Sequence, residues 1–472
     1  MRDVVFLKQS TLGWRIVSLG KECASFSLRE YEALFPPAHS VLDTSTVRNV
    51  ISYAAAQTSI ATSANFRRNV MKILSRVGRF FATAFGVAYL LLSPSVAFSS
   101  CDPQFRQVNE DGFGDPLNIY AWSMKAFKGY LYVGTAHMAA TRDEFQGTAE
   151  LWRYDGNEWE QIMDDGFGNP FNTGIRNLVI YNDRLYAAVA NEAQGAQIWR
   201  SIDGVNWVRV MDGGFDDIGN EAVRGMVDFK GRLFAGAQDT AGGNGALWAS
   251  YGGAFWTPVA PEAFLFPNNS SVHDVGKYQD VIYAGVRNTN SGAQVWRSPD
   301  GVDWEMVVGP GAPTRAGFGN PKTVLTFHFQ EFNDLLYLAT ANAVDGFALF
   351  RTADGVNYER IGEYGFGDGE NAYGWRMHTY EGALWLGVTS TNILRKGGSV
   401  FRSFDGENWE EMIGAAGTYM GYGFDDTRNW GIRSFETYNG KLYIGTAQCW
   451  FEGCERFVTG AEVWEWSGES CP

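Results

Sequence analysis

Charged residues are scarce in this chain, and basic residues are the scarcest. Asp, Glu, Lys and Arg make up only 19% of 472 residues, and 38 basic against 53 acidic residues give a net charge of −15. Nucleic-acid-binding proteins usually carry a basic surplus, so we expect no nucleic-acid partner. Histidine and cysteine number five each, and neither a His-Glu-x-x-His motif nor a glycine-rich phosphate loop is present. We therefore expect no metal site and no cofactor.

Aromatic residues and glycine, by contrast, are abundant. Phe, Trp and Tyr reach 15% of the chain, with 17 Trp, and there are 56 Gly. Disordered chains are poor in aromatic residues, and collagen would need glycine at every third position. Neither class fits, and no sustained heptad repeat indicates a coiled coil. The composition indicates an ordered chain with many turns.

The largest apolar run near the N-terminus has the pattern of a secretory signal peptide. After Met71 come three basic residues, the apolar stretch 80–92 and a small-residue cleavage motif that ends at Ala97. We expect residues 1–70 to result from a start codon assigned too early; the alternative is a genuine extension with a signal anchor. Residues 71–97 are then the signal peptide, and residues 98–472 carry 27 basic against 48 acidic side chains. We expect a secreted, periplasmic or cell-surface monomer with no membrane span in the mature protein.

A repeated unit runs through the rest of the chain. Its middle part is a Leu-Tyr type strand, seen at residues 131–134, 185–187, 233–236, 282–285, 335–337, 384–387 and 442–445. A second strand follows each, centred on Trp152, Trp199, Trp248, Trp296, Phe350, Phe401 and Trp464. Each unit opens with a Gly-Phe loop, at Phe113, Phe167, Phe215, Phe318, Phe366 and Phe424, with Phe264 as a degenerate copy. Seven copies with 47 to 63 residues between anchors indicate a repeat architecture.

Each unit contains four short segments with strand character, separated by turn signals. We name them strands A to D in chain order, with the Leu-Tyr segment as strand B. Four antiparallel strands repeated around a ring form a β-propeller blade. The sequence thus predicts an all-β, seven-bladed β-propeller over residues 98–472. The seventh unit lacks its strand D, and residues 105–108 supply it, so the N-terminal strand is expected to close the last blade.

Four cysteines remain after the expected cleavage: Cys101, Cys449, Cys454 and Cys471. Of the three possible pairings we favour Cys101–Cys471 and Cys449–Cys454. Cys101 and Cys471 both fall beside the C–D turn of the split blade, and the other two lie five residues apart in one loop. Disulfides would agree with an oxidising compartment. A lipoprotein cleavage site at Cys101 is the alternative, and a lipidated Cys101 could not pair with Cys471.

The C–D turns share a short motif. Examples are Ser201-x-Asp203-Gly204-x-x-Trp207 and Ser403-x-Asp405-Gly406-x-x-Trp409. These turns resemble the Asp-box of sialidases and other BNR-type propellers, although every copy is one residue shorter than the usual motif. The resemblance implies a propeller in which Asp bonds to turn amides and Gly takes a positive φ. A more distant similarity is to the integrin-type FG-GAP propeller, but the calcium loop of that family is missing.

The seven residues that lie nine positions after the loop phenylalanines are expected to form a ring at the mouth of the central channel. These positions hold Trp122, Arg176, Arg224, His273, Phe327, Trp375 and Arg433, and the next position adds His328 and Arg376. Arginine binds carboxylate or sulfate in a bidentate manner, and indole faces stack on sugar rings. The alternative is that the arginines are structural and bond to loop Asn side chains and carbonyls. Trp122 and Trp375 are expected to contribute to packing more than to binding.

These features favour a non-catalytic propeller that binds an extracellular glycan or protein partner at the Gly-Phe end. The first alternative is a secreted, sialidase-like hydrolase or lyase that uses the same arginines, with Asp143, Glu192 or Asp239 as acids. The second alternative is a structural cell-surface protein. Two acidic side chains about 5–10 Å apart beside the arginines would favour the enzyme. Arginines paired with Asp or Asn would favour the structural role.

Overall fold

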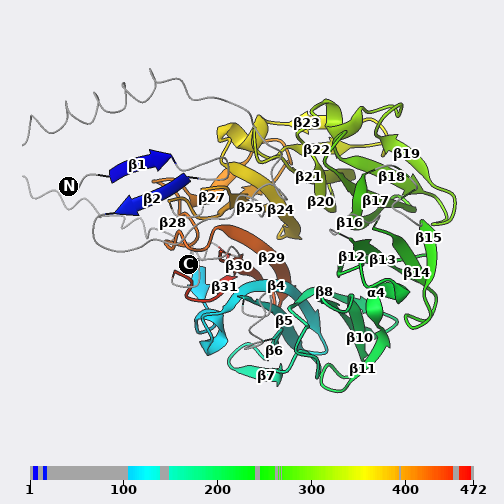
Figure 1. The fold of residues 1–472 in the computed structure, drawn as a ribbon, viewed down its shortest axis with the longest axis horizontal. Coiled ribbons are helices and arrows are strands. Elements are labelled where there is room, and N and C mark those ends of the chain that lie inside the picture. The colour runs from blue at the N-terminus through cyan, green and yellow to red at the C-terminus, as the bar shows by residue number, and fades with distance from the viewer. Residues whose placement is uncertain are drawn as a thin grey trace, which may run out of the picture. The chain divides into compact units, whose positions relative to one another are not determined.

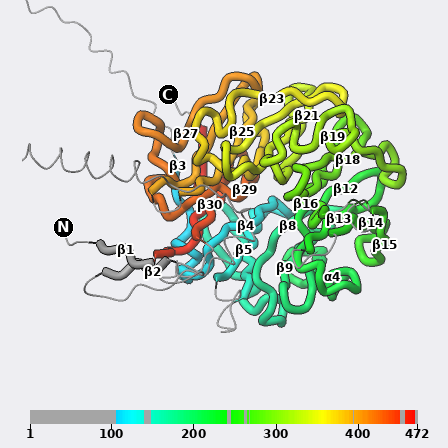
Figure 2. Tube along the Cα trace, turned by 45° about the horizontal axis from the view of Figure 1, so that its top comes forward, coloured from blue at the N-terminus to red at the C-terminus, as the bar shows by residue number. Residues whose placement is uncertain are grey.

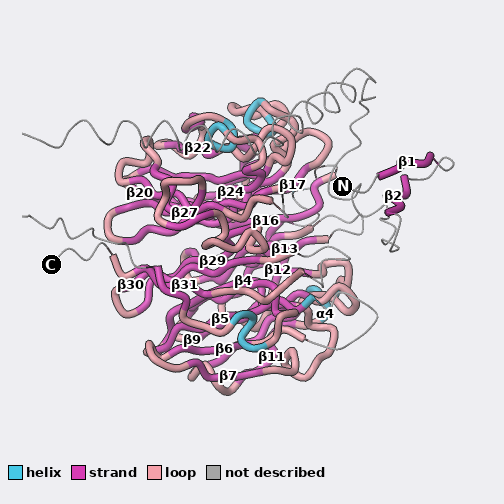
Figure 3. Tube along the Cα trace, turned by 90° about the vertical axis from the view of Figure 1, so that its left-hand side faces the viewer, coloured by secondary structure: helices cyan, strands magenta, loops and turns pink. Residues whose placement is uncertain are grey.

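The computed structural model describes residues 4–8, 14–18, 105–138, 148–239, 245–260, 264, 266, 268–392, 395–449 and 457–468. The chain divides into two compact units, residues 1–99 and 100–472. In the first unit, β1 (Val4–Lys8) and β2 (Trp14–Ser18) form an antiparallel pair. The second unit is built almost entirely of β-strands (Figures 1 and 3). No helix among the described residues is long and apolar enough to cross a membrane.

The strands of the second unit pair into antiparallel sets of four, which we call sheets I to VII. Sheet I is β4 (Asn118–Phe127), β5 (Tyr130–His137), β6 (Leu151–Tyr154) and β7 (Trp159–Met163). Sheet II is β8 (Gly174–Tyr181), β9 (Arg184–Ala190), β10 (Gln197–Ser201) and β11 (Trp207–Met211). Sheet III is β12 (Ala222–Phe229), β13 (Arg232–Gln238), β14 (Leu247–Ser250) and β15 (Thr257–Ala260). Sheet IV is β16 (Asn269–Tyr278), β17 (Val281–Asn288), β18 (Gln294–Ser298) and β19 (Glu305–Val308).

The remaining sheets complete the circle. Sheet V is β20 (Leu325–Phe332), β21 (Leu335–Ala341), β22 (Leu349–Thr352) and β23 (Glu359–Ile361). Sheet VI is β24 (Asn371–Tyr380), β25 (Ala383–Ser390), β26 (Ser399–Ser403) and β27 (Glu410–Gly414), with the short β28 (Met420–Gly421) parallel to β27. Sheet VII is β29 (Gly431–Tyr438), β30 (Lys441–Ala447), β31 (Val463–Trp466) and β3 (Phe105–Gln107).

The innermost strands of successive sheets contact one another around a central axis. β4, β8, β12, β16, β20, β24 and β29 follow in this order, and β29 returns to β4 (Figure 1). In Figure 2 the C-terminal strand β30 lies beside the cyan β4, to which it is paired. β3 pairs with β31, so a strand from the N-terminal side completes the last sheet. The predicted all-β propeller with closure by the N-terminal strand is therefore confirmed.

The Gly-Phe loops have the same structure around the ring. Every loop phenylalanine takes a positive φ, from 55° to 69°, which is unusual for a bulky residue. The ring of Phe215, for example, stacks on Trp248 with centroids 4.7 Å apart, and its edge meets Trp256. Asn220 closes the same loop because its Nδ2 donates to the carbonyl of Gly214 at 2.9 Å. The loop phenylalanines are thus packed inside the blades, which gives them a structural role.

The C–D turns join neighbouring sheets. In the turn of sheet II, Asp203 Oδ1 accepts hydrogen bonds from the amides of Val205 and Asn206 at 2.9 and 2.8 Å, and Gly204 has φ +82°. A side chain at Gly204 would clash with Tyr132 of sheet I, 1.9 Å from the Cβ position. The same contact joins Tyr186 to Gly253, Tyr283 to Gly355 and Tyr337 to Gly406. In these four sheets the tyrosine of the Leu-Tyr strand therefore packs against the turn of the following sheet, and Phe234 takes this place against Gly301. The Asp-box family resemblance itself stays a prediction.

Several predictions fall outside the described residues. Within residues 1–97 the structure describes only strands β1 and β2, which both lie before residue 70. Neither the predicted extension (1–70) nor the predicted signal peptide (71–97) is therefore tested. Cys101, Cys454 and Cys471 also lie outside the described residues, whereas Cys449 is buried. Both cysteine pairings stay predictions.

Candidate functional site

One residue of each innermost strand interrupts the pairing with its neighbour. In all seven sheets the register shifts across the ninth residue after the loop phenylalanine. The residues in these gaps are Trp122, Arg176, Arg224, His273, Phe327, Trp375 and Arg433, which we call the ring residues. A β-bulge leaves a residue unpaired and re-aims its side chain. Seven equivalent bulges thus place the predicted positions at one level around the axis.

The three ring arginines have guanidinium nitrogens that lack hydrogen-bond partners. Nε and Nη1 of Arg176 and the Nε atoms of Arg224 and Arg433 are buried and unpaired within the described part of the chain. Each of the three side chains as a whole keeps some contact with solvent. The expected Arg–Asn or Arg–Asp pairs of a structural ring are not seen at these nitrogens. Unsatisfied buried donors of this kind call for a ligand, an ion or water.

Like charges are crowded at this level. Burial, together with the neighbouring Arg176 and Arg433, lowers the pKa of Arg224 well below its ordinary value. Burial also lowers the pKa of Arg176, to about 10, although Glu221 and Glu192 oppose the shift. His273 has a pKa well below its ordinary value, because it is buried and because several arginines repel its proton. His273 is therefore neutral near pH 7, and the positive charge of the ring lies on the arginines.

The two ring tryptophans hold the arginines in place. The guanidinium of Arg176 lies 4.0 Å from the ring centre of Trp122, and that of Arg433 lies 4.8 Å from Trp375. Trp122 and Trp375 are only 4% and 7% exposed, and Tyr120 meets the edge of each. Their indole faces are already covered. In this conformation both residues pack against their neighbours, and the expected stacking of sugar rings on them stays a prediction.

The fit of Trp122 depends on a glycine in the next sheet, and this gives a first prediction. A Cβ at Gly174 would lie 2.3 Å from Cζ3 of Trp122. Gly174→Ala should therefore lower the free energy of unfolding by about 1–3 kcal/mol in urea denaturation, because the buried indole must shift. Gly252→Ala is the matched control, since no atom lies within 4 Å of its Cβ position. A Gly174→Ala/Trp122→Leu double variant should recover part of the loss, and an unchanged stability in Gly174→Ala would contradict the packing role.

At five of the seven positions, the side chain after the bulge forms a hydrogen bond to the backbone of the next sheet. Ser123 Oγ donates to the carbonyl of Ile175, and Ser434 Oγ donates to that of Ala121, both at 2.7 Å. Asn177 likewise donates to carbonyls of sheet III, whereas Asp274 and His328 accept from backbone amides of sheets V and VI. Arg376 occupies the same position in sheet VI. It interacts electrostatically with Asp274 and Glu436 but forms no ion pair with a described residue. Arg376 is thus a fourth arginine available near the axis.

Acidic groups lie beside the arginines of sheets II and III. Glu192 and Glu221 both interact electrostatically with Arg176. Burial and the charge of Glu221 raise the pKa of Glu192 above its ordinary value. Asp143, named from the sequence as another acid, lies outside the described residues. Among described residues, no group of three or more His, Cys, Asp or Glu is placed to hold a metal ion.

One basic residue near the axis was not found from the sequence. Arg287, at the end of β17, is partly buried, and its Nη1 donates to Ser270 Oγ at 2.9 Å. Its charge acts on both Arg224 and His273. A repeat-by-repeat comparison of strand B would have found it, because the same position holds alanine in several other units.

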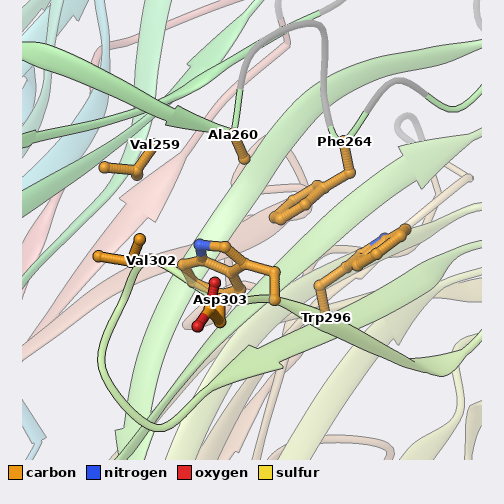
Figure 4. Close-up of a pocket in the computed structure, with 7 residues that line it drawn as sticks. Val259, Ala260, Phe264, Trp296, Val302 and Asp303 are labelled. Carbon is orange, nitrogen blue, oxygen red and sulfur yellow. The ribbon is translucent and has the colours of Figure 1, made fainter.

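A separate pocket of about 310 Å³ lies between sheets III and IV (Figure 4). Its lining residues are Val259, Ala260, Phe264, Trp296, Val302, Asp303 and Trp304. Phe264 stacks on Trp296 with centroids 4.5 Å apart, as Phe215 does on Trp248. The charged residue of this lining is Asp303, whose sign does not suit an anionic ligand. None of the ring residues reaches this pocket.

Similarity to known proteins is found only among solved structures. No family model and no curated protein matches the sequence. A prolyl endopeptidase structure covers 74% of this chain at 11% identity with a TM-score of 0.41, and this chain spans only half of that structure. The β-propeller domain of the Trilobed protease from Pyrococcus furiosus covers 74% at 11% identity with a TM-score of 0.43, and 96% of that domain is matched. A luciferin-regenerating enzyme covers 78% at 10% identity with a TM-score of 0.40, and 95% of it is matched. Likeness at this level carries no inference about activity.

Proposed function

We propose that this protein is an exported propeller that binds an acidic group of an extracellular glycan at its arginine ring, without catalysis. One observation carries the proposal: guanidinium nitrogens of Arg176, Arg224 and Arg433 are buried at one level of the axis without partners. A buried donor left unsatisfied costs about 1–3 kcal/mol, and more when it is charged. A bound carboxylate or sulfate would satisfy several of these donors at once.

The surrounding charges support an anion over a neutral ligand. The chain as a whole is acidic, with a net charge of −15. A general surplus of basic residues therefore does not explain the cluster of unpaired arginines. The aromatic faces next to the arginines are covered. We therefore assign recognition to the guanidinium groups, and we expect neutral sugars to bind far more weakly than acidic ones.

A second candidate function is hydrolysis of an acidic glycan at the same place. Glu192 and Glu221 lie close enough to Arg176 to act on its charge, and burial and Glu221 raise the pKa of Glu192. Two neighbouring carboxyl groups, one of them with a raised pKa, are the usual arrangement of acid and base in a glycoside hydrolase. This pair is the observation that favours an enzyme.

The test is calorimetric titration of the purified full chain with sialylated, sulfated, uronic-acid and neutral glycans, with product analysis on the same samples. We expect acidic glycans to bind and neutral ones not to. A triple Arg176→Gln/Arg224→Gln/Arg433→Gln variant should weaken binding at least about 100-fold, since each lost bidentate contact removes a charge-assisted bond. Arg209→Gln is the control for loss of an arginine away from the ring, because Arg209 is exposed and forms an ion pair with Asp212.

The outcomes separate the two candidate functions. Binding without product, lost in the triple variant alone, supports the proposal. Product that disappears in Glu192→Gln while binding persists supports the enzyme. No binding by any acidic glycan, or equal binding by the triple variant, overturns the proposed site.

A further inference from the structure

Asp274 is a buried carboxyl group at the level directly below the ring. It follows the bulge residue His273 in β16 and is 5% exposed. Its Oδ2 accepts a hydrogen bond from the amide of Phe329 in sheet V at 2.9 Å. His328, at the equivalent position in β20, accepts the corresponding bond from the amide of Met377 with an uncharged imidazole. The link itself therefore does not require a carboxylate.

Groups from every neighbouring element face Asp274. Arg376 on β24 and Arg433 on β29 attract its charge, and the amides of Phe329 on β20 and Val275 on β16 bond to it. On β12, Gly225 lies against the carboxyl group: a Cβ at this glycine would be 2.9 Å from Asp274 Oδ1. The neighbouring imidazoles of His273 and His328 have pKa values well below their ordinary value through burial and nearby arginines, so both are neutral near pH 7.

Asp274 is therefore placed as a partial counter-charge to the arginines. No ion pair joins it to Arg376 or Arg433, so the arginines keep their donors for another anion. Burial raises the pKa of Asp274 to about 7, although the two arginines oppose this shift. The carboxyl group thus changes charge in the neutral range.

We infer that ionised Asp274 and the bound anion are both attracted by the same arginines and repel each other. Binding of the anion is therefore coupled to uptake of a proton by Asp274. This inference rests on the proposed function, because it assigns a regulator to the same site. A second negative charge beside Arg376 and Arg433 disfavours the ionised carboxylate, and protonation removes the repulsion. Below about pH 6 the proton is already present and affinity is at its highest. Above about pH 7 the proton must be taken up, and affinity falls by up to about tenfold per pH unit.

The probe for this inference is inorganic sulfate, which stays a dianion throughout the neutral range, so any proton exchanged comes from the protein. Titration calorimetry at pH 7.5 in buffers of different ionisation enthalpy measures that exchange. We expect uptake of up to about three-quarters of a proton per sulfate by the wild-type full chain, because about a quarter of Asp274 is already protonated at pH 7.5. Asp274→Asn should bind sulfate with no uptake and with an affinity that stays constant between about pH 5.5 and 8.5. Glu331→Gln is the control, because Glu331 is an exposed acid on β20, and it should keep the wild-type profile.

Failure of the inference and failure of the proposed function give different results. Sulfate binding with pH-independent affinity and no proton uptake in the wild type overturns the inference and leaves the anion site intact. Uptake that persists in Asp274→Asn also overturns it, because another group then supplies the proton site. No sulfate binding even at pH 5.5 overturns the proposed function and the inference together. If Asp274→Asn does not fold, Asp274→Ser, which places here the residue found at Ser123 and Ser434, makes the same comparison.

Discussion

Arg224→Met is expected to make the ligand-free protein more stable while it weakens anion binding by about 100-fold. Arg224 places a buried, unpaired Nε among like charges. Methionine has a similar length without the polar group, so the desolvation cost disappears and the volume is largely kept. The free energy of unfolding should rise by about 1–3 kcal/mol, the cost of one unsatisfied buried donor. Urea denaturation without ligand measures the gain.

Opposite effects on stability and binding are what separates a binding residue from a structural one. Stabilising changes at functional sites commonly reduce function, because such sites retain groups that the folded state alone does not need. Arg209→Met is the control for an arginine-to-methionine change at an exposed site. We expect it to change the free energy of unfolding by less than about 0.5 kcal/mol. A loss of more than about 1 kcal/mol in Arg224→Met would show that the guanidinium supports the fold. That result would contradict the proposed role of Arg224 in anion binding.

The position of the ring residues could be predicted from the sequence, but the reason for it could not. Counting nine residues from each loop phenylalanine finds Arg176 and its counterparts because the repeats keep one length in this stretch. The bulge at each of these positions is a property of pairing between two strands. No residue type marks it, since the bulged positions hold Trp, Arg, His and Phe. The sequence pattern therefore locates these side chains without showing what aims them at the axis.

Other features depend on contacts between sheets and are hidden from a single repeat. The conformation of Phe215, with φ 65°, is compensated by stacking on Trp248 and by the bond from Asn220. Asp274 looks like any strand residue, and only the arrival of Arg376 and Arg433 from other sheets gives it a role. Strand closure is different, because the missing strand D and the extra segment 105–108 are both visible in the sequence.

Glu465→Leu is expected to loosen the closure of the propeller. Glu465 lies on β31 and is 4% exposed. It accepts hydrogen bonds from Arg106 of β3 at 3.2 Å, from Lys441 of β30 at 2.9 Å and from the hydroxyl of Tyr443 at 2.9 Å. Removing the carboxylate leaves the buried Tyr443 hydroxyl without its acceptor and frees Arg106. Since Arg106 and Lys441 are partly exposed, water replaces part of the loss, and the expected cost is about 1–3 kcal/mol.

The pH dependence of this closure has a definite sign. Burial, the largest influence, raises the pKa of Glu465, but the bonds from Lys441 and Tyr443 and the charge of Arg106 outweigh it, so the pKa is lowered. A carboxyl group with a lowered pKa stabilises the folded state fully above its unfolded pKa. That contribution is lost as the pH falls through the lower, folded pKa. Wild type should therefore lose stability relative to Glu465→Leu in acid, and the difference between them should be largest near neutral pH.

Hydrogen exchange of the β3 amides is the direct measurement, because opening of the last sheet exposes this strand first. Exchange in Glu465→Leu should rise about 10-fold or more at β3, while the inner strand β16 stays protected. Glu160→Gln is the matched control: Glu160 pairs with Arg153 across the equivalent outer strands of sheet I but is largely exposed. Faster exchange spread evenly over all sheets would mean global destabilisation. It would count against a clasp that acts where the two ends of the chain meet.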